Sequence, residues 1–157
     1  MFYKCYLKKG NVYLPTTVSQ GIALYMDVDP ITVIPVMDTE RLRRAMRDTI
    51  PKENAFRAPK IEDARNPPAI LKYTGDKSWP AFMRGASLWS IYEKGGMFQI
   101  EPHRVHRKGY WEQNRDQIIK FPSGTSIDVV IDRMIAILQG AAGASIKPSP
   151  AAGRKKS

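Results

Sequence analysis

The chain has 157 residues, with 25 lysines and arginines against 15 aspartates and glutamates, and its formal net charge is +10 at pH 7. A chain of this length can bury a sizeable core by itself, and its single cysteine, Cys5, excludes an intrachain disulfide and a cluster of thiolate ligands. It contains no apolar span of about 20 residues and opens without the pattern of a secretory signal. We therefore expect a cytoplasmic protein that makes no membrane contact and whose positive charge favours an acidic partner.

A hairpin is expected at the start of the chain. Residues 2–8 and 12–15 are rich in tyrosine and branched side chains, and Lys9, Gly10 and Asn11 between them suit a turn. Because side chains alternate along a strand, the even-numbered residues of the first strand should lie on one face and the other face should carry Tyr3, Cys5 and Leu7.

The next segment, residues 21–37, has apolar residues at strand spacing, but Pro30 and Pro35 cannot donate hydrogen bonds to a neighbouring strand. It should form two short strands or an edge strand with a bend. A helix is expected near residues 39–50, because Asp38 or the threonine after it can cap the N-terminus. Its inward face would carry Leu42, Ala45, Met46 and Ile50.

A proline-rich connection follows over residues 52–80. Within it, residues 69–73 are predicted to form a strand, and Ser78 is predicted to cap one or two helical turns. A long connection with so little regular structure is typical of a functional loop.

The second half of the chain predicts another hairpin and a closing helix. The hairpin comprises residues 87–92 and 97–104, joined by a turn at residues 94–96. The helix covers residues 126–139, is capped by Ser126, and has apolar residues spaced three and four apart. These elements predict an α+β fold with a mainly antiparallel sheet, two hairpins, one helix near residues 39–50 and a C-terminal helix near residues 126–139.

The charge pattern divides the chain into a domain and a tail. We expect a single domain over residues 1–140 and a disordered basic tail over residues 141–157, because the tail has too few apolar side chains to offset the entropy of ordering it. Removing the four positive charges of the tail from +10 leaves +6 on the domain. These four charges are Lys147, Arg154, Lys155 and Lys156.

No motif in the sequence indicates catalysis, a metal site or a cofactor. On a helix, His103 and His106 would share a face and could bind a metal ion with a third ligand, but Pro102 and the preceding hairpin favour a strand, on which they would point to opposite faces. We therefore expect no metal site. Gln99, Glu101 and His103 would share one face, and the carboxylate could raise the pKa of the imidazole for acid–base chemistry. A solvated polar face explains the same three residues more simply, and we expect no catalytic residues.

The main candidate binding surface is a run of cations and aromatic residues. Cations attract phosphates and aromatic rings stack on unpaired bases, so this run suits RNA or single-stranded DNA. Tryptophan, tyrosine and arginine also dominate protein interfaces, so the run equally suits an acidic protein surface. A third alternative places the two aromatic residues in the core beside a solvated turn. The predicted partner-binding residues are His103, Arg104, His106, Arg107, Lys108, Tyr110 and Trp111.

The helix near residues 39–50 offers a second candidate. Arg43 and Arg47 lie one turn apart, so they should repel each other and favour a bound anion. The alternative is that they form the solvated face of an amphipathic helix. We include both arginines among the predicted partner-binding residues.

Four segments, residues 13–16, 71–73, 77–79 and 84–91, together with the closing helix, resemble small bacterial immunity-type proteins. Such proteins accompany polymorphic or contact-dependent-inhibition toxins. The resemblance implies a non-enzymatic cytoplasmic inhibitor that covers a toxin, often a nuclease. Because the domain is basic, it would need an acidic toxin face or a contact away from the nucleic-acid groove. We therefore predict an immunity protein that binds a toxin, with nucleic-acid binding as the alternative.

Overall fold

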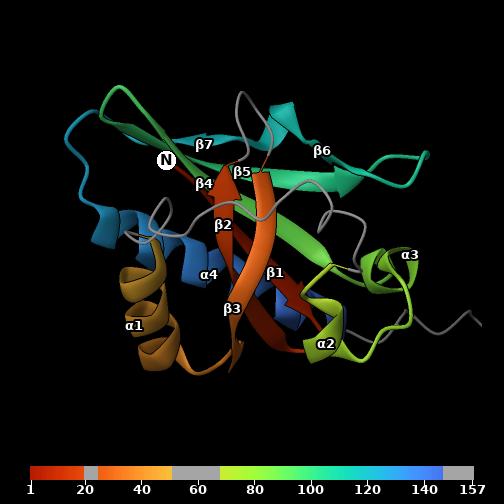
Figure 1. Ribbon diagram of the computed structural model, residues 1–157. Helices are drawn as coiled ribbons and strands as arrows, with labels where there is room; N and C mark the ends of the chain where they lie inside the picture. The colour runs from red at the N-terminus through yellow and green to blue at the C-terminus, as the bar shows by residue number, and fades with distance from the viewer. Residues whose placement is uncertain (20–24, 51–67, 147–157) are drawn as a thin grey trace, which may run out of the picture.

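The computed structural model describes residues 1–19, 25–50 and 68–146 (Figure 1). Its strands form one antiparallel sheet in the order β3-β2-β1-β4-β5-β6, and β7 pairs with another part of β5. The α+β prediction is therefore confirmed. The strands are β1 (Phe2–Lys8), β2 (Asn11–Ser19), β3 (Tyr25–Pro35), β4 (Ser87–Lys94), β5 (Met97–Val105), β6 (Trp111–Gln113) and β7 (Ile119–Lys120). The helices are α1 (Thr39–Thr49), α2 (Leu71–Thr74), α3 (Trp79–Met83), the 3-10 turn η3 (Arg115–Gln117) and α4 (Ile127–Ile146).

Both predicted hairpins are present, and their first strands pair with each other. β1 pairs with β2 through the turn at Lys9 and Gly10, and β4 pairs with β5 through Gly95 and Gly96. β1 and β4 lie antiparallel at the centre of the sheet, where Cys5 of β1 is opposite Trp89 of β4. The two hairpins therefore lie next to each other in one sheet.

The strands around the two prolines differ from the prediction in length. β2 continues past Pro15 to Ser19, because a shift in register between Leu14 and Thr16 accommodates the proline. β3 is one edge strand, which confirms the second of the two alternatives. Pro30 lies at this register shift and Pro35 at the end of the strand, where a missing backbone donor costs least.

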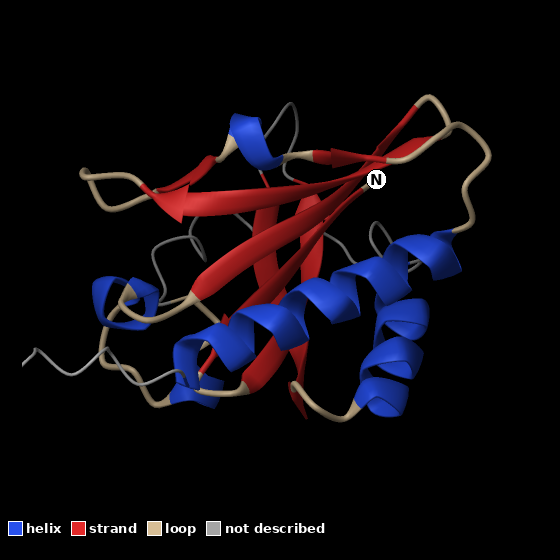
Figure 2. Cartoon of the chain, turned by 180° about the vertical axis from the view of Figure 1, so that it is seen from behind, coloured by secondary structure: helices blue, strands red, loops and turns tan. Residues whose placement is uncertain are grey.

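The alternation along β1 separates two hydrophobic clusters. Tyr3, Cys5 and Leu7 contribute to a large cluster with α1 and α4, as predicted from the strand period. Tyr6 lies on the opposite face, in a smaller cluster with Phe82 of α3 and residues next to α2. Figure 2 shows α4 crossing the sheet, with α1 beside it.

The two long helices begin where the sequence indicates. Asp38 accepts a hydrogen bond from the backbone N–H of Arg41 at 3.3 Å, and Ser126 accepts one from Val129 at 3.4 Å. The apolar stripe of α4 is buried, as predicted. However, α4 continues to Ile146 and buries Ala142, so the predicted tail begins too early. Small residues are compatible with a helix whose neighbours cover one side. Residues 147–157 lie outside the described residues.

The predicted strand at residues 69–73 is wrong. The segment forms the single helical turn α2, and Gly75 ends it in the left-handed conformation, with a φ of 73° and its N–H bonded to the carbonyl of Leu71. A short apolar run does not distinguish a strand from a buried helical turn. The glycine was the available signal for the helix end. The cap at Ser78 is confirmed, because its hydroxyl accepts from Ala81 at 3.2 Å.

Candidate interaction surface

The turn between β5 and β6 exposes part of the predicted basic and aromatic run. Arg107 and Lys108 are exposed, and Tyr110 is 49% exposed. The backbone N–H of His106 donates to the carbonyl of Tyr110 at 2.7 Å, and Gly109 donates to the carbonyl of His106 at 2.8 Å. These bonds hold the turn closed, so its cations extend from a defined backbone.

A stacked pair of rings stiffens this turn. The rings of His106 and Tyr110 lie 4.5 Å apart at an interplanar angle of 16°. His106 also accepts a hydrogen bond on Nδ1 from the backbone N–H of Lys108 at 3.1 Å. Within the described part of the chain, neither Arg107 nor Lys108 forms an ion pair. The turn therefore presents an ordered tyrosine beside two cations that are available to an acidic partner.

Two other predicted residues of the run make contacts within the protein. Arg104 donates from Nε to Glu112 at 2.7 Å across the β5–β6 ladder, so its charge is already paired. Trp111 is partly buried and packs edge to face on Tyr6, with ring centroids 6.4 Å apart. The two aromatic residues therefore differ, since Tyr110 lies at the surface and Trp111 packs against the smaller hydrophobic cluster.

His103 does not join the exposed cations. Its Nε2 lies 2.8 Å from the hydroxyl of Ser90, which is fully buried on β4. Burial, and to a smaller extent the positive charge of Lys4, lower the pKa of His103 to about 4. The alternative in which Glu101 raises this pKa is therefore not supported, because desolvation of the imidazole and the charge of Lys4 both lower it.

The polar face of β5 is not a solvated surface either. Glu101 is only 6% exposed, accepts a hydrogen bond from Gln99, and lies 3.4 Å from the hydroxyl of Ser90. Ser90 and His103 have the separation of a nucleophile and its base, but a substrate cannot reach a serine that is 0% exposed. We therefore interpret this group as a structural hydrogen-bond network. Sequence reasoning missed Ser90, because its place opposite Glu101 depends on the register of β4 and β5.

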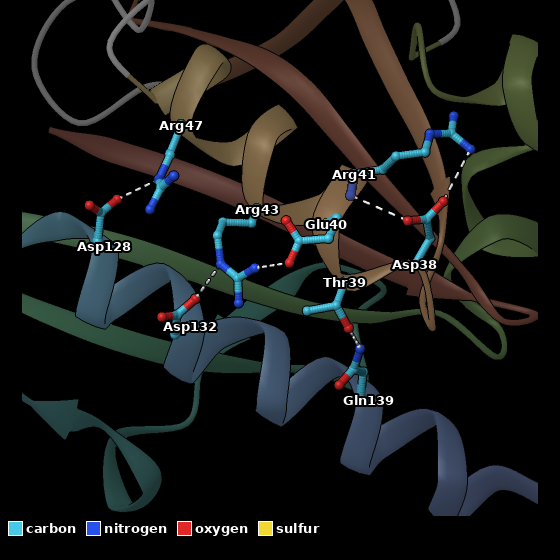
Figure 3. Close-up of polar contacts among 9 residues, drawn as sticks. All are labelled: Asp38, Thr39, Glu40, Arg41, Arg43, Arg47, Asp128, Asp132 and Gln139. Atoms are coloured by element: carbon cyan, nitrogen blue, oxygen red, sulfur yellow. Dashed lines mark hydrogen bonds and ion pairs between the residues drawn. The ribbon is translucent and has the colours of Figure 1, made fainter.

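Arg43 and Arg47 serve a contact between helices (Figure 3). Arg43 donates to Asp132 of α4 at 2.9 Å and also bonds Glu40, while Arg47 donates to Asp128 of α4 at 2.6 Å. The two arginines therefore do not depend on an external anion, because α4 supplies the carboxylates, and their part in partner binding stays a prediction. Figures 1 and 2 both place α1 and the β5–β6 turn at opposite ends of the molecule, so the structure does not bring the two predicted groups together.

Two further features concern metal and membrane binding. Among residues 1–19, 25–50 and 68–146, no group of three or more histidine, cysteine, aspartate or glutamate side chains is placed to hold a metal ion. In the same part of the chain, no helix is both long and apolar enough to cross a membrane.

Comparisons with known proteins find similarity in structure but not in sequence. No protein-family model matches the chain, and no curated protein matches its sequence. One similar structure is a protein of unknown function, NMB0488, from Neisseria meningitidis, with a TM-score of 0.61 and 14% identity over 90% of this chain and 95% of that one. Another comes from the CdiA-CT/CdiI toxin and immunity complex of Yersinia pseudotuberculosis, with a TM-score of 0.57 and 10% identity over 90% and 95%.

The chain shares its fold with a chain of a toxin–immunity complex. This similarity covers most of both chains and supports the resemblance noted from the sequence at the level of fold. At 10% identity it does not identify binding residues.

Proposed function

We propose that the protein is a cytoplasmic immunity-type inhibitor that binds a toxin without catalysing a reaction. The observation that carries this proposal is the similarity of fold, over 90% of the chain, to a chain of a toxin and immunity complex. A protein–protein complex also agrees with the surface chemistry, since the β5–β6 turn exposes residue types that dominate protein interfaces.

The β5–β6 turn is the part of the surface that we assign to the toxin. Tyr110 offers a ring that is held in place by stacking on His106, so little side-chain entropy is lost when a partner covers it. Arg107 and Lys108 flank this ring with exposed positive charge. Val105, which is 45% exposed, adds apolar area beside the same turn.

The charge of the protein defines the toxin surface that it could bind. The whole chain carries +10, so it would be repelled by the basic groove with which a nuclease binds its substrate. An acidic face of the toxin would instead attract the turn and accelerate association. The proposed inhibitor therefore acts through an acidic surface and does not imitate nucleic acid.

The test begins with capture of the partner and then measures toxicity. The full chain is immobilised, exposed to nuclease-treated lysate of its source at low and moderate salt, and the bound proteins are identified. A retained partner is then expressed in a bacterial host, alone and together with this chain. The proposal expects the partner alone to stop growth and co-expression to restore it. A partner that is harmless, or whose toxicity persists during co-expression, would overturn the proposal.

Variants of the turn test the assigned surface. Arg107→Ala or Tyr110→Ala should each weaken binding of the identified toxin by about thirtyfold, which is the loss expected for an interface hot spot. Arg133→Ala on α4 removes the same charge from an exposed site and should change affinity by less than about twofold. Equal effects of Arg107→Ala and Arg133→Ala would mean that net charge, and not this turn, determines binding.

Nucleic-acid binding is the second candidate, because the same turn combines two exposed cations with an exposed tyrosine ring. Recovery of RNA or single-stranded DNA without nuclease treatment, with steep loss as salt rises, would favour it. A protein partner that survives both treatments would favour the inhibitor, because a buried protein interface is screened less.

A further inference from the structure

A cavity of ≈ 440 Å³ lies at the other end of β5 from the β5–β6 turn. It is formed where the turn between β4 and β5 approaches β7, and Figure 1 shows these elements side by side. Its walls are mainly apolar and aromatic. They comprise Tyr92, Met97, Phe98 and Phe121.

The charged side chains that line this cavity are both cationic, and Gln99 is a further polar residue of its lining. Lys94 and Lys120 line it and are both exposed, and neither forms an ion pair within the described part of the chain. The nearby carboxylate of Glu93 accepts a hydrogen bond from the backbone N–H of Gly96 at 2.9 Å and lies 3.8 Å from the N-terminal ammonium. The cavity therefore combines apolar walls with two exposed positive charges.

We propose that this cavity binds a small amphipathic anion, with an aromatic body and one carboxylate or sulfonate group. The volume falls in the range of roughly 300–1,000 Å³ that is typical of small-molecule sites, and such sites have apolar walls with few polar groups. The aromatic body would be buried against Phe98, Phe121 and Met97. Lys94 and Lys120 would bind the anionic group at the opening, where each ammonium is still free to move.

Met97 supports a binding role for the cavity. It is 54% exposed although its neighbours in the cavity are apolar, so its flexible thioether can adapt to a ligand without disturbing the core. The charges support an anion over a neutral or cationic compound, because the two lysines would repel a cation. The site is separate from the β5–β6 turn and does not depend on the proposed function.

Two fluorescent probes test the proposal directly. 8-Anilinonaphthalene-1-sulfonate has the required aromatic body and anionic group, and N-phenyl-1-naphthylamine has the same body without the charge. Titration of the full chain with each probe should show saturable binding of one sulfonate probe per protein, with about tenfold tighter binding than for the neutral probe.

Matched variants locate the binding site. The double variant Lys94→Gln/Lys120→Gln should weaken sulfonate binding by about tenfold and leave binding of the neutral probe unchanged. The double variant Lys9→Gln/Lys77→Gln removes equal charge from exposed sites outside the cavity and should retain the original affinity. Met97→Ser should weaken binding of both probes severalfold, whereas Met37→Ser, at a residue that is 71% exposed elsewhere, should not.

Three results would overturn this proposal. They are binding of several sulfonate molecules without saturation, equal affinity for the charged and neutral probes, and equal losses in the cavity and control variants. None of these results depends on a toxin, so failure of the cavity proposal and failure of the proposed function can be distinguished.

Discussion

Single residues on the sheet show how burial changes the chemistry that a sequence pattern suggests. Glu101 and His103 are two residues apart on β5, which on an exposed strand would favour the protonated imidazole. In the structure, the hydroxyl of the buried Ser90 on β4 lies 2.8 Å from Nε2 of His103. Desolvation then stabilises the neutral imidazole, and the group acts as a structural network.

Lys8 shows the opposite outcome, in which a buried charge is fully matched. It is 5% exposed, donates to Asp76 at 3.0 Å, and also donates to the carbonyls of Ala81 and Phe82 at the end of α3. The ammonium lies 5.2 Å from the centre of the Phe82 ring. Carboxylate, carbonyls and ring together offset the cost of removing this cation from water.

The lowered pKa of His103 predicts a dependence of stability on pH. The folded protein has a His103 pKa of about 4, below the ordinary value of 6.5, so the unfolded chain binds a proton first as the pH falls. The free energy of unfolding should therefore fall between about pH 6.5 and pH 4, and this contribution should be fully present only above pH 6.5. The substitution His103→Gln removes this pH-dependent contribution to the free energy of unfolding.

Urea unfolding of both proteins across this pH range measures the effect. Other carboxylates titrate in both proteins, so the informative quantity is the difference in free energy of unfolding between the natural chain and His103→Gln. This difference should shift against the natural chain as the pH falls. A difference that stays constant from pH 6.5 to pH 4 would show that burial does not perturb His103.

At the scale of elements, polar contacts orient α1 on α4. Arg43 and Arg47 reach Asp132 and Asp128, and Figure 3 shows both pairs on the same side of the helix contact. Near the other end of α1, the side-chain amide of Gln139 donates to Thr39 at 2.8 Å and to the carbonyl of Val36 at 3.1 Å. The buried stripes stabilise the contact, and these polar pairs lie along its edge from one end of α1 to the other.

Arg47→Gln tests how much the outer pair contributes. Arg47 is 49% exposed and Asp128 is 52% exposed, so water screens the pair and the free energy of unfolding should fall by only about 0.5 kcal/mol at low salt. The loss should vanish at high salt. Denaturant unfolding at two salt concentrations gives both values, with Arg133→Gln as the control for net charge. A loss that persists at high salt would indicate that Arg47 contributes through packing.

At the scale of the whole molecule, helices cover parts of both faces of the sheet. The larger cluster lies under α1 and α4, and the smaller one lies under α2 and α3. β1 contributes alternate residues to both clusters, so loss of either should be transmitted through the central strands. We therefore expect the two faces to unfold in one transition.

Phe82→Ala and Met134→Ala remove one fully buried side chain from each cluster. Each should lower the free energy of unfolding by about 3 kcal/mol, because the burial free energy of the removed atoms is lost and the cavity left behind adds a further cost. Trp89 packs against the larger cluster, so it is replaced by phenylalanine in every protein compared, and fluorescence then reports on Trp79 and Trp111 at the smaller cluster. Far-UV circular dichroism reports on the helices, of which α4 is the longest. The two signals should change together in the protein with this replacement alone and in both variants. An earlier fluorescence change in Phe82→Ala would show that α2 and α3 unfold independently.

The elements were largely predictable because their signals are local. Capping residues, alternation along β1 and the apolar stripe of α4 depend on neighbours within a few positions of the chain. Local signals were weak at residues 69–73, where a strand was wrongly predicted. They were also weak at the C-terminal end of α4, which was predicted at residue 139 and lies at Ile146. A short apolar run is ambiguous, and small residues become helical only where another element covers them.

The sequence by itself determined the α+β class, the two hairpins and the presence of cations beside aromatic residues, because strand period, turn residues and composition are properties of contiguous segments. Only the tertiary structure decided which of those cations are free. It paired Arg43 and Arg47 with α4, placed His103 against Ser90 and left Arg107 and Lys108 exposed. Such pairings join residues far apart in the chain, so strand register and helix packing determine them.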